Sequence, residues 1–350
     1  MCREKKMKII VDVMGGDNAP RETVRGAFAA SLEWNSELIL VGDRAAIESI
    51  AAEEGFDLSR VEIEHADDVI TMEDDPLSIT RAKKGSSMAV GLRLLAEGRG
   101  DALVSTGNTG ALFTGATLIV RKVKGIGRAG IATVLPCQNP VLLMDCGANV
   151  TVTEENLEQF GVIGSAYMKK MFGLASPRVG LLNNGAEECK GTDLQRAAYR
   201  LLAENQSLNF VGNVEGSALP FDRCDVLVTD GFTGNVLLKS VEGVGKLILG
   251  KMKNVFYTNF ITKLAALLVK PGLRAMKHEL DPNEYGGAPL LGISKPVIKA
   301  HGSSDAKAFK NAIRQAAAYA ASGATEEIAR AAQEYAAQKK AHKAEAATQE

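Results

Sequence analysis

The sequence has little of what marks several specialised protein classes. Its five cysteines are odd in number, widely spaced and never in a C-x-x-C pair, so neither a disulfide framework nor a zinc site is predicted. The apolar run after the basic N-terminus is only as long as a strand, and no run elsewhere approaches about 18 apolar residues. We therefore expect reduced thiols in a cytoplasmic protein, without a signal peptide or a membrane-spanning helix.

An excess of charge of one sign is also missing. The 41 basic and 42 acidic side chains leave a formal charge of −1, which gives no chain-wide electrostatic reason to bind nucleic acid. The four histidines are scattered, and neither an H-E-x-x-H nor a Walker A pattern occurs. Neither a nucleic-acid partner nor a metal site is predicted.

Two kinds of catalytic pattern are absent or out of context. Gly125, Gly127 and Gly130 form a G-x-G-x-x-G, but the residues that follow read as a strand, whereas a dinucleotide fingerprint opens a helix. No G-x-S-x-G elbow is present, and no cysteine lies in an obvious nucleophile context. A covalent acyl-enzyme is therefore not indicated.

Glycine, in contrast, is abundant at 35 of 350 residues, above the usual ~7%. Many glycines stand where a short β-branched run gives way to a helical stretch. We expect strands at 9–13, 38–41, 102–105, 141–144, 179–182, 226–229 and 297–299. This alternation predicts an α/β fold with a mostly parallel sheet, whose strand carboxyl ends share one ligand-binding edge.

The loops on that edge suit an anion. Ser105–Gly110 and Thr229–Asn235 place small residues and amides where helices begin, and a third loop adds His301, Ser303 and Ser304. Lys190 is the lysine within a glycine-flanked loop, and it would complement a phosphate or an oxyanion. The plainer alternatives are ordinary turns, an N-cap at Ser304 or Asp305, and a solvated lysine. Four aspartates on the same edge are assigned chiefly to loop organisation: Asp12, Asp17, Asp145 and Asp230.

One segment departs from the even charge balance. Residues 246–277 carry seven basic and no acidic side chains, together with a helical apolar stripe that includes Leu264 and Leu268. This segment reads either as a helix packed on the core or on a dimer mate, or as a basic amphipathic hairpin that contacts an anionic membrane or an acidic partner. The residues expected to make that contact are Lys251, Lys253, Leu264, Leu268 and Lys270.

Seven motifs together are specific enough to suggest a family. In order along the chain they are MGGDNAP (14–20), STGNTGAL (105–112), DCGAN (145–149), GLLNNGAEECKG (180–191), FVGNVEG (210–216), TDGFTGNVLLK (229–239), and YGGAPLLG with VIKAHGSSDAKAF (285–309). They resemble the bacterial phosphate acyltransferases that make acyl phosphate from acyl carrier protein thioesters. Val13 and Asn18 depart from the family pattern, so position 18 is given no essential proton transfer.

The resemblance implies a three-layer α/β/α fold similar to the isocitrate/isopropylmalate dehydrogenase type, in a single domain over 7–322 followed by a helix and polar tail over 324–350. It also implies a homodimer that converts long-chain acyl-[acyl carrier protein] and inorganic phosphate to acyl phosphate for phospholipid synthesis. No cofactor is required. The protein would be cytoplasmic, with peripheral membrane contact and a membrane glycerol-3-phosphate acyltransferase as the next enzyme.

Within this reaction the candidate residues take separate roles. Catalysis is assigned to Lys190, His301 and Asn235. Binding of phosphate and the acyl group is assigned to Gly15, Gly16, Asp17, Asn108, Thr109, Asn149, Ser303 and Ser304. His301 either protonates the departing thiolate or hydrogen-bonds phosphate.

Three other functions remain open from the sequence. One is a phosphotransacetylase-like enzyme that uses acyl-CoA, and another is a non-catalytic module that docks on membranes and binds a phosphorylated metabolite. An NAD-dependent β-decarboxylating dehydrogenase is less well supported, because the sequence shows no convincing arginine cluster or Mg²⁺ carboxylate set.

Overall fold

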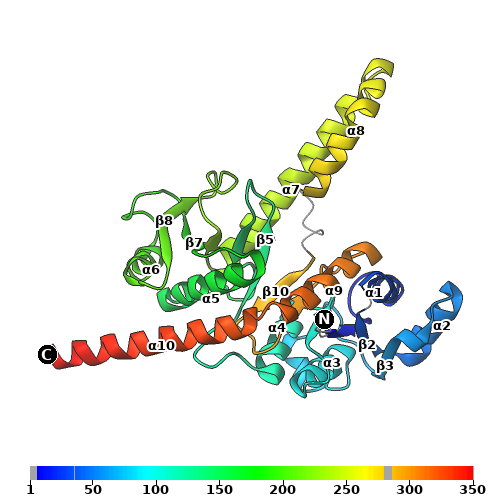
Figure 1. The fold of residues 1–350 in the computed structure, drawn as a ribbon, viewed down its shortest axis with the longest axis horizontal. Coiled ribbons are helices and arrows are strands. Elements are labelled where there is room, and N and C mark those ends of the chain that lie inside the picture. The colour runs from blue at the N-terminus through cyan, green and yellow to red at the C-terminus, as the bar shows by residue number, and fades with distance from the viewer. Residues whose placement is uncertain (1–5, 35, 280–285, 350) are drawn as a thin grey trace, which may run out of the picture.

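The computed structural model describes residues 6–34, 36–279 and 286–349. Most of the basic N-terminus, and Tyr285 at the start of one motif, lie outside these residues. Figure 1 shows two lobes joined at β5 and β10, with a helical hairpin that projects from them and a long C-terminal helix. The helices are α1 Arg21–Trp34, α2 Arg44–Glu54, α3 Ser87–Ala96, α4 Thr109–Gly115, α5 Glu154–Phe172, α6 Asp193–Glu204, α7 Gly231–Phe256, α8 Phe260–Glu279, α9 Ala306–Ala321 and α10 Ala324–Gln349.

One sheet of eleven strands runs through both lobes, in the order β3-β2-β1-β4-β11-β10-β5-β6-β9-β7-β8. The strands are β1 Lys8–Asp12, β2 Glu37–Gly42, β3 Val61–His65, β4 Ala102–Ser105, β5 Gly130–Leu135, β6 Val141–Met144, β7 Arg178–Asn183, β8 Asn209–Glu215, β9 Val226–Val228, β10 Ala288–Leu291 and β11 Val297–Lys299. All seven expected strands are present, some shifted by one residue at an end. β5 is also the strand expected after the G-x-G-x-x-G, so that motif opens no helix.

The expectation of one ligand-binding edge is wrong, because the sheet changes direction. β10 is antiparallel to both β11 and β5, and β5 is antiparallel to β6. The strands β6, β9, β7 and β8 therefore run opposite to β3, β2, β1, β4 and β11. The loops at the strand carboxyl ends form two groups, one for each lobe, although the sheet as a whole is mostly parallel.

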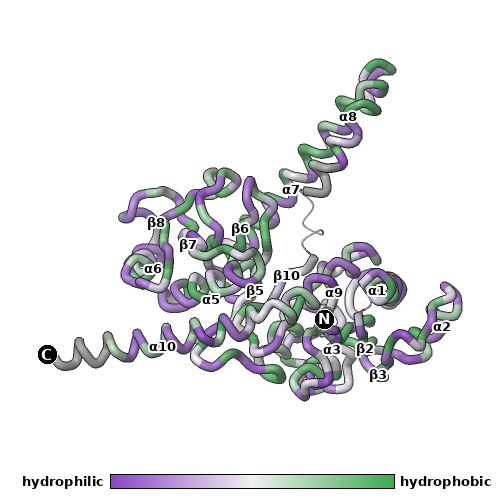
Figure 2. The backbone as a smooth tube through the Cα atoms, viewed as in Figure 1, coloured by the Kyte–Doolittle hydropathy of each residue, from purple (hydrophilic) through white to green (hydrophobic). Residues whose placement is uncertain are grey.

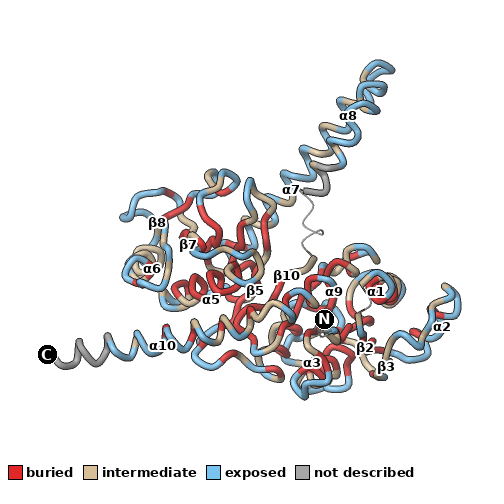
Figure 3. Tube along the Cα trace, in the orientation of Figure 1, coloured by how far each residue is buried: buried red, intermediate tan, exposed pale blue. Residues whose placement is uncertain are grey.

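Alternate strand residues build two apolar layers. Ile9 and Val11 of β1 pack in the layer that includes α1, α5 and α9, whereas Ile10 packs with α3 and α4 on the other face. Both layers include residues of both lobes, and Figure 3 shows buried segments in each lobe. The three-layer α/β/α sandwich is thereby confirmed.

Local sequence signals begin several helices. Thr153 and Thr192 form capping boxes with Asn156 and Gln195, and so begin α5 and α6. Asp305 caps α9 by accepting the Ala308 amide at 2.8 Å, so it is Asp305 rather than Ser304 that makes this cap.

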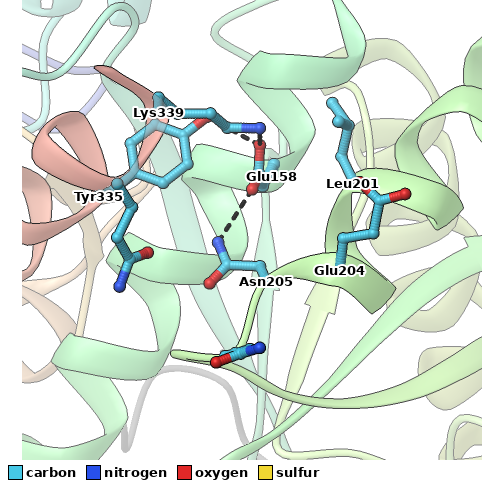
Figure 4. Close-up of a pocket in the computed structure, with 8 residues that line it drawn as sticks. Glu158, Leu201, Glu204, Asn205, Tyr335 and Lys339 are labelled. Carbon is cyan, nitrogen blue, oxygen red and sulfur yellow. Dashed lines mark hydrogen bonds and ion pairs between the residues drawn. The ribbon is translucent and has the colours of Figure 1, made fainter. Parts of the chain in front are cut away.

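The C-terminal helix α10 lies along α5 and continues to Gln349, so the polar tail expected at the end of the chain is helical. Part of this contact is made by Glu158 of α5, which is 2% exposed. The Glu158 carboxylate accepts hydrogen bonds from Tyr335 and Asn205 at 2.8 and 2.9 Å and pairs with Lys339 at 2.7 Å. Figure 4 shows the small cavity beside this cluster, about 160 Å³ in volume, which contains none of the predicted site residues.

Candidate active site

The first group of loops leaves β1, β4 and β11. Asp12, the last residue of β1, is buried and accepts hydrogen bonds from the Ser105 hydroxyl at 2.6 Å and the Met14 amide at 3.2 Å. The Ser105 oxygen in turn accepts the Gly107 amide at 3.1 Å. Burial raises the pKa of Asp12, and these hydrogen bonds oppose that rise. The network joins the loops after β1 and β4.

Gly15 and Gly16 lie in the loop after β1, where its backbone contacts the loops after β4 and β11. Gly16 has a φ of 94°, and a Cβ there would come within 2.9 Å of the Gly302 carbonyl oxygen. The same oxygen accepts the Asp17 amide at 2.8 Å, and the Thr106 hydroxyl donates to the Gly15 carbonyl. The predicted residues Gly15, Gly16 and Asp17 are therefore in direct contact with the other two loops.

Asn108 and Thr109 lie at the start of α4 and differ in whether their side chains are available to a ligand. The Asn108 side chain accepts the Ala111 amide at 3.0 Å and donates to the carbonyls of Thr71 and Met72 at 3.2 and 3.1 Å. Its polar atoms are thus engaged in holding the loop. Thr109, in contrast, is exposed at the first position of the helix.

His301 and Ser303 form a local unit after β11. The Ser303 amide donates to His301 Nδ1 at 3.2 Å, and the Ser303 hydroxyl lies 2.9 Å from the same atom. Because a backbone amide can only donate, Nδ1 accepts, and the neutral imidazole carries its proton on Nε2. Burial, and next the charge of Lys239, lowers the pKa of His301. Ser304 is buried beside this unit.

The structure adds a residue that the sequence did not single out. Lys299, the last residue of β11, donates from Nζ to the carbonyls of Thr106 at 2.9 Å and Ala300 at 2.5 Å. Burial lowers its pKa to about 8, and Asp12 and Asp17 oppose that shift. The only sequence signal was a lysine at the end of an apolar strand, next to the loop that holds His301.

The second group of loops centres on Asp145, at the end of β6. This buried carboxylate accepts the amides of Ile131, Ala148 and Asn149 at 3.1, 3.0 and 2.7 Å. The Asn149 side chain also donates to Asp145 at 2.8 Å and to the Ala129 carbonyl at 2.8 Å. Burial raises the pKa of Asp145, and these donors oppose the rise. The Asn149 side chain thus holds the turn, which supports the assignment of Asp145 to loop organisation.

α7 begins against this turn. Its N-cap is Asp230, which accepts the Thr233 amide at 2.8 Å. Gly234 packs so closely that a Cβ there would lie 1.9 Å from the Asp145 carbonyl oxygen. Asn235, the next residue, is exposed, and its side chain lies beside Gly147 of the same turn.

The first turns of α7 connect the two loop groups. Lys239 pairs with Glu242 at 2.9 Å. The charges of both residues act on the pKa of His301 in one lobe and of Cys146 in the other. The structure therefore brings the second loop group close enough to His301 for their charges to interact, although the loops leave oppositely directed strands.

Lys190 lies apart from the loops described above. It is exposed in the loop after β7, whose shape depends on hydrogen bonds from the Lys190 amide to the Glu187 carbonyl at 3.1 Å and from Asn183 to the Lys190 carbonyl at 3.2 Å. In the described part of the chain, none of these hydrogen bonds joins Lys190 to the other predicted site residues.

The basic segment belongs to a hairpin longer than its charge pattern suggested, comprising the whole of α7 and α8. It projects from the lobes and is exposed along most of its length (Figure 3). Leu264 and Leu268 are 54% and 81% exposed, so the stripe does not pack on the core of this chain. Apolar and polar residues alternate along the hairpin (Figure 2), and Lys251, Lys253 and Lys270 are exposed with them.

Over residues 6–34, 36–279 and 286–349, no group of three His, Cys, Asp or Glu side chains is placed to hold a metal ion. Within the same residues, no helix combines the length and the apolar character needed to cross a bilayer.

Comparison with known proteins gives a consistent family. The model of the family described as "Fatty acid synthesis protein" matches residues 7–327. A phosphate acyltransferase of Acetivibrio thermocellus is 45% identical over 324 residues, 92% of this chain and 95% of the relative. One of Alkaliphilus oremlandii is 46% identical over 311 residues, 89% of this chain and 92% of the relative.

Solved structures share the fold at lower identity. A phosphotransacetylase of Streptococcus pyogenes has a TM-score of 0.63 at 19% identity, covering 91% of this chain and 94% of its own. A 4-hydroxythreonine-4-phosphate dehydrogenase of Burkholderia phymatum has a TM-score of 0.51 at 16% identity, covering 90% and 99%. The family match and the relatives together establish that this chain belongs to the fatty acid synthesis protein family, as an enzyme of the acyltransferase class related to bacterial phosphate acyltransferases.

Proposed function

We propose that this enzyme transfers a long-chain acyl group from acyl carrier protein to inorganic phosphate, and that the acyl phosphate feeds phospholipid synthesis. The observation that carries the proposal is the identity of about 45% with phosphate acyltransferases over nine-tenths of the chain. The meeting of the loops after β1, β4 and β11 supports it, because backbone amides and hydroxyls gathered in one place suit a phosphate. A non-catalytic module is set aside, since the relatives are transferases.

Phosphate binds among the first group of loops. Gly15 and Gly16 bring backbone close to the anion, while Thr109 and Ser303 supply exposed hydroxyls. Asn108 and Ser304 hold the loops in place. Asp17 takes part through its backbone amide, which donates to the Gly302 carbonyl and holds the loop, because a carboxylate beside phosphate would repel it.

The reaction is a direct displacement at the thioester. A phosphate oxygen forms a bond to the carbonyl carbon, the carbonyl oxygen becomes an oxyanion, and the carbon–sulfur bond then breaks with the electron pair leaving on sulfur. The carrier thiolate takes a proton from water or from an acid in the site. Phosphate is already anionic, so the enzyme mainly positions the two substrates and stabilises the oxyanion.

His301 acts as a neutral hydrogen-bond donor. Its Nδ1 is occupied by the Ser303 amide, and burial and the Lys239 charge lower its pKa, so the imidazolium is disfavoured near neutral pH. The Nε2–H group remains to bind a phosphate oxygen or the oxyanion. Of the two roles expected for His301, hydrogen bonding to an anion therefore fits better than protonation of the thiolate.

Asn235, Asn149 and Lys190 complete the assignment. Asn235 is exposed beside Gly147, where its amide can orient the thioester. Asn149 acts through the Asp145 turn that it holds. Lys190 contributes positive charge to the oxyanion, brought to the site when the substrate is bound.

The hairpin α7–α8 provides the membrane contact. Its exposed leucines and lysines have the composition of a surface that enters the headgroup region of an anionic bilayer. The acidic acyl carrier protein docks on the same basic surface, and the enzyme works as a cytoplasmic homodimer. A product delivered at the bilayer would reach a membrane glycerol-3-phosphate acyltransferase directly.

The test combines purified protein, long-chain acyl carrier protein and phosphate, with the product trapped by hydroxylamine as a hydroxamate. We expect product that depends on phosphate. A parallel reaction with acyl-CoA separates the phosphotransacetylase-like alternative, which predicts equal turnover of both thioesters. Absence of product, or product without phosphate, would remove the proposal.

A further inference from the structure

Lys299 occupies the centre of the first loop group. It ends β11, where it pairs in register with Ser105 at the end of β4. Its ammonium donates to the Thr106 carbonyl, in the loop after β4, and to the Ala300 carbonyl, in the loop after β11. The Lys299 side chain thus contacts the first residues of both loops.

The charge on Lys299 is only partly balanced. Within the part of the chain that the structure describes, Lys299 makes no ion pair, although Asp12 and Asp17 are near enough to act on its pKa. An ammonium has three donors, and two carbonyls use two of them. Because Lys299 is half-buried and its ammonium keeps one donor for a further partner, this position favours an anion.

Phosphate binding beside the Asp12 and Asp17 carboxylates requires a positive charge that offsets theirs. Asp12 is already engaged by the Ser105 hydroxyl and the Met14 amide, and the Asp17 amide is held by Gly302. Their negative charges would still weaken phosphate binding unless a positive charge offset them. Among the residues that the structure describes, Lys299 is the basic side chain that donates hydrogen bonds to both the β4 and the β11 loops.

We propose that Lys299 is the cation that binds the phosphate substrate, with its third N–H donor directed to a phosphate oxygen. This inference rests on the proposed function, because it assigns a residue to the phosphate of that reaction. It also explains why a lysine stands at the end of an otherwise apolar strand. A purely structural lysine would instead only tie the two loops together.

The experiment measures KM for phosphate and for acyl carrier protein thioester in Lys299→Met and Lys299→Arg. For Lys299→Met we expect KM for phosphate to rise about tenfold to hundredfold, the loss typical of one charged hydrogen bond, with KM for the thioester within about twofold. Lys299→Arg keeps the charge and should restore most of the phosphate affinity. Lys295→Met, in the same segment but ahead of β11, is the matched control and should behave as the wild type.

A second readout is independent of turnover. Inorganic phosphate should raise the melting temperature of the wild type and of Lys299→Arg, but not of Lys299→Met. Unchanged KM for phosphate in Lys299→Met, or an equal rise for both substrates, would overturn the assignment. If Lys299→Met does not fold, loss of phosphate stabilisation in folded Lys299→Arg would overturn it as well. A wild type that is stabilised by phosphate but makes no acyl phosphate would contradict the proposed reaction and leave the Lys299 assignment supported.

Discussion

Two regions of the molecule differ in which side chains they bury. One comprises the loops after β1, β4 and β11, and the other is the hairpin α7–α8. In the loops, polar groups such as Asp12 and Ser105 are buried and bonded to one another. In the hairpin, apolar groups such as Leu264 and Leu268 are exposed. The loops are therefore organised by this chain alone, whereas the hairpin surface needs something outside the chain to cover it.

That difference separates two kinds of variant. Changes at the loop edge should alter folding or chemistry, because the partners of each group lie in the same chain. Changes on the hairpin should leave folding intact and alter only association.

The largest effect is expected at the joint between α7 and the Asp145 turn. In Gly234→Ala, the added carbon would lie 1.9 Å from the Asp145 carbonyl oxygen, so backbone must move. We expect about 3 kcal/mol of destabilisation, a fall in melting temperature of about 5 °C and loss of turnover. Gly243→Ala, in the same helix with open space around it, is the control and should be neutral or slightly stabilising. Equal melting temperatures for the two variants would show that the close contact is not present.

A large but different effect is expected on the hairpin. Leu268→Glu should reduce co-sedimentation with anionic vesicles at least about tenfold, because a buried leucine contributes roughly 1.5–3 kcal/mol. Its melting temperature should not change, since Leu268 is 81% exposed. Leu32→Glu on α1, 59% exposed in the wild type, is the control. Unfolding of Leu268→Glu, or unaltered vesicle binding, would contradict the membrane assignment.

A smaller effect is expected at Lys190. Lys190→Ala should lower kcat about tenfold if its charge stabilises the oxyanion, with little change in stability because the side chain is exposed. Arg223→Ala serves as a comparison, since it removes an exposed charge that has no assigned role. Wild-type turnover in a folded Lys190→Ala enzyme would remove Lys190 from the mechanism.

The smallest effect concerns pH. Lys299 has a pKa near 8, lowered by burial, so its ammonium loses the proton as pH rises through 8, and the attraction for phosphate weakens. The charged groups near Lys299 are the Asp12 and Asp17 carboxylates, which favour its protonated form, and His301 lies in the adjoining loop. KM for phosphate should rise about four- to eightfold between pH 7.5 and 9 in the wild type, because the protonated fraction of Lys299 falls over this range, and should stay level in Lys299→Arg. A parallel rise in both enzymes would assign the change to another group.

Local structure was predictable from the sequence because its causes are local. The strands at 102–105, 141–144 and 297–299 and the caps at Thr153 and Thr192 follow from β-branched runs and capping residues. The reversal of the sheet was not predictable, since it depends on β10 pairing with strands far away in the chain.

The site was predictable in part for the same reason. Glycine-rich loops can be recognised from the sequence alone. The structure then brings Gly16, Asp17 and the loop of His301 together. Lys299 and Lys239 look ordinary, one at a strand end and one in a helix. Only the folded chain places the first between two loops and the second within electrostatic reach of His301.

The central claim is that phosphate itself attacks the thioester. Its most direct measurement is release of the free carrier thiol with and without phosphate, together with the intact mass of the enzyme. We predict release equal to acyl phosphate formed, no release without phosphate, and no acylated enzyme. Thiol release in the absence of phosphate, or an enzyme that gains the mass of an acyl group, would contradict direct attack.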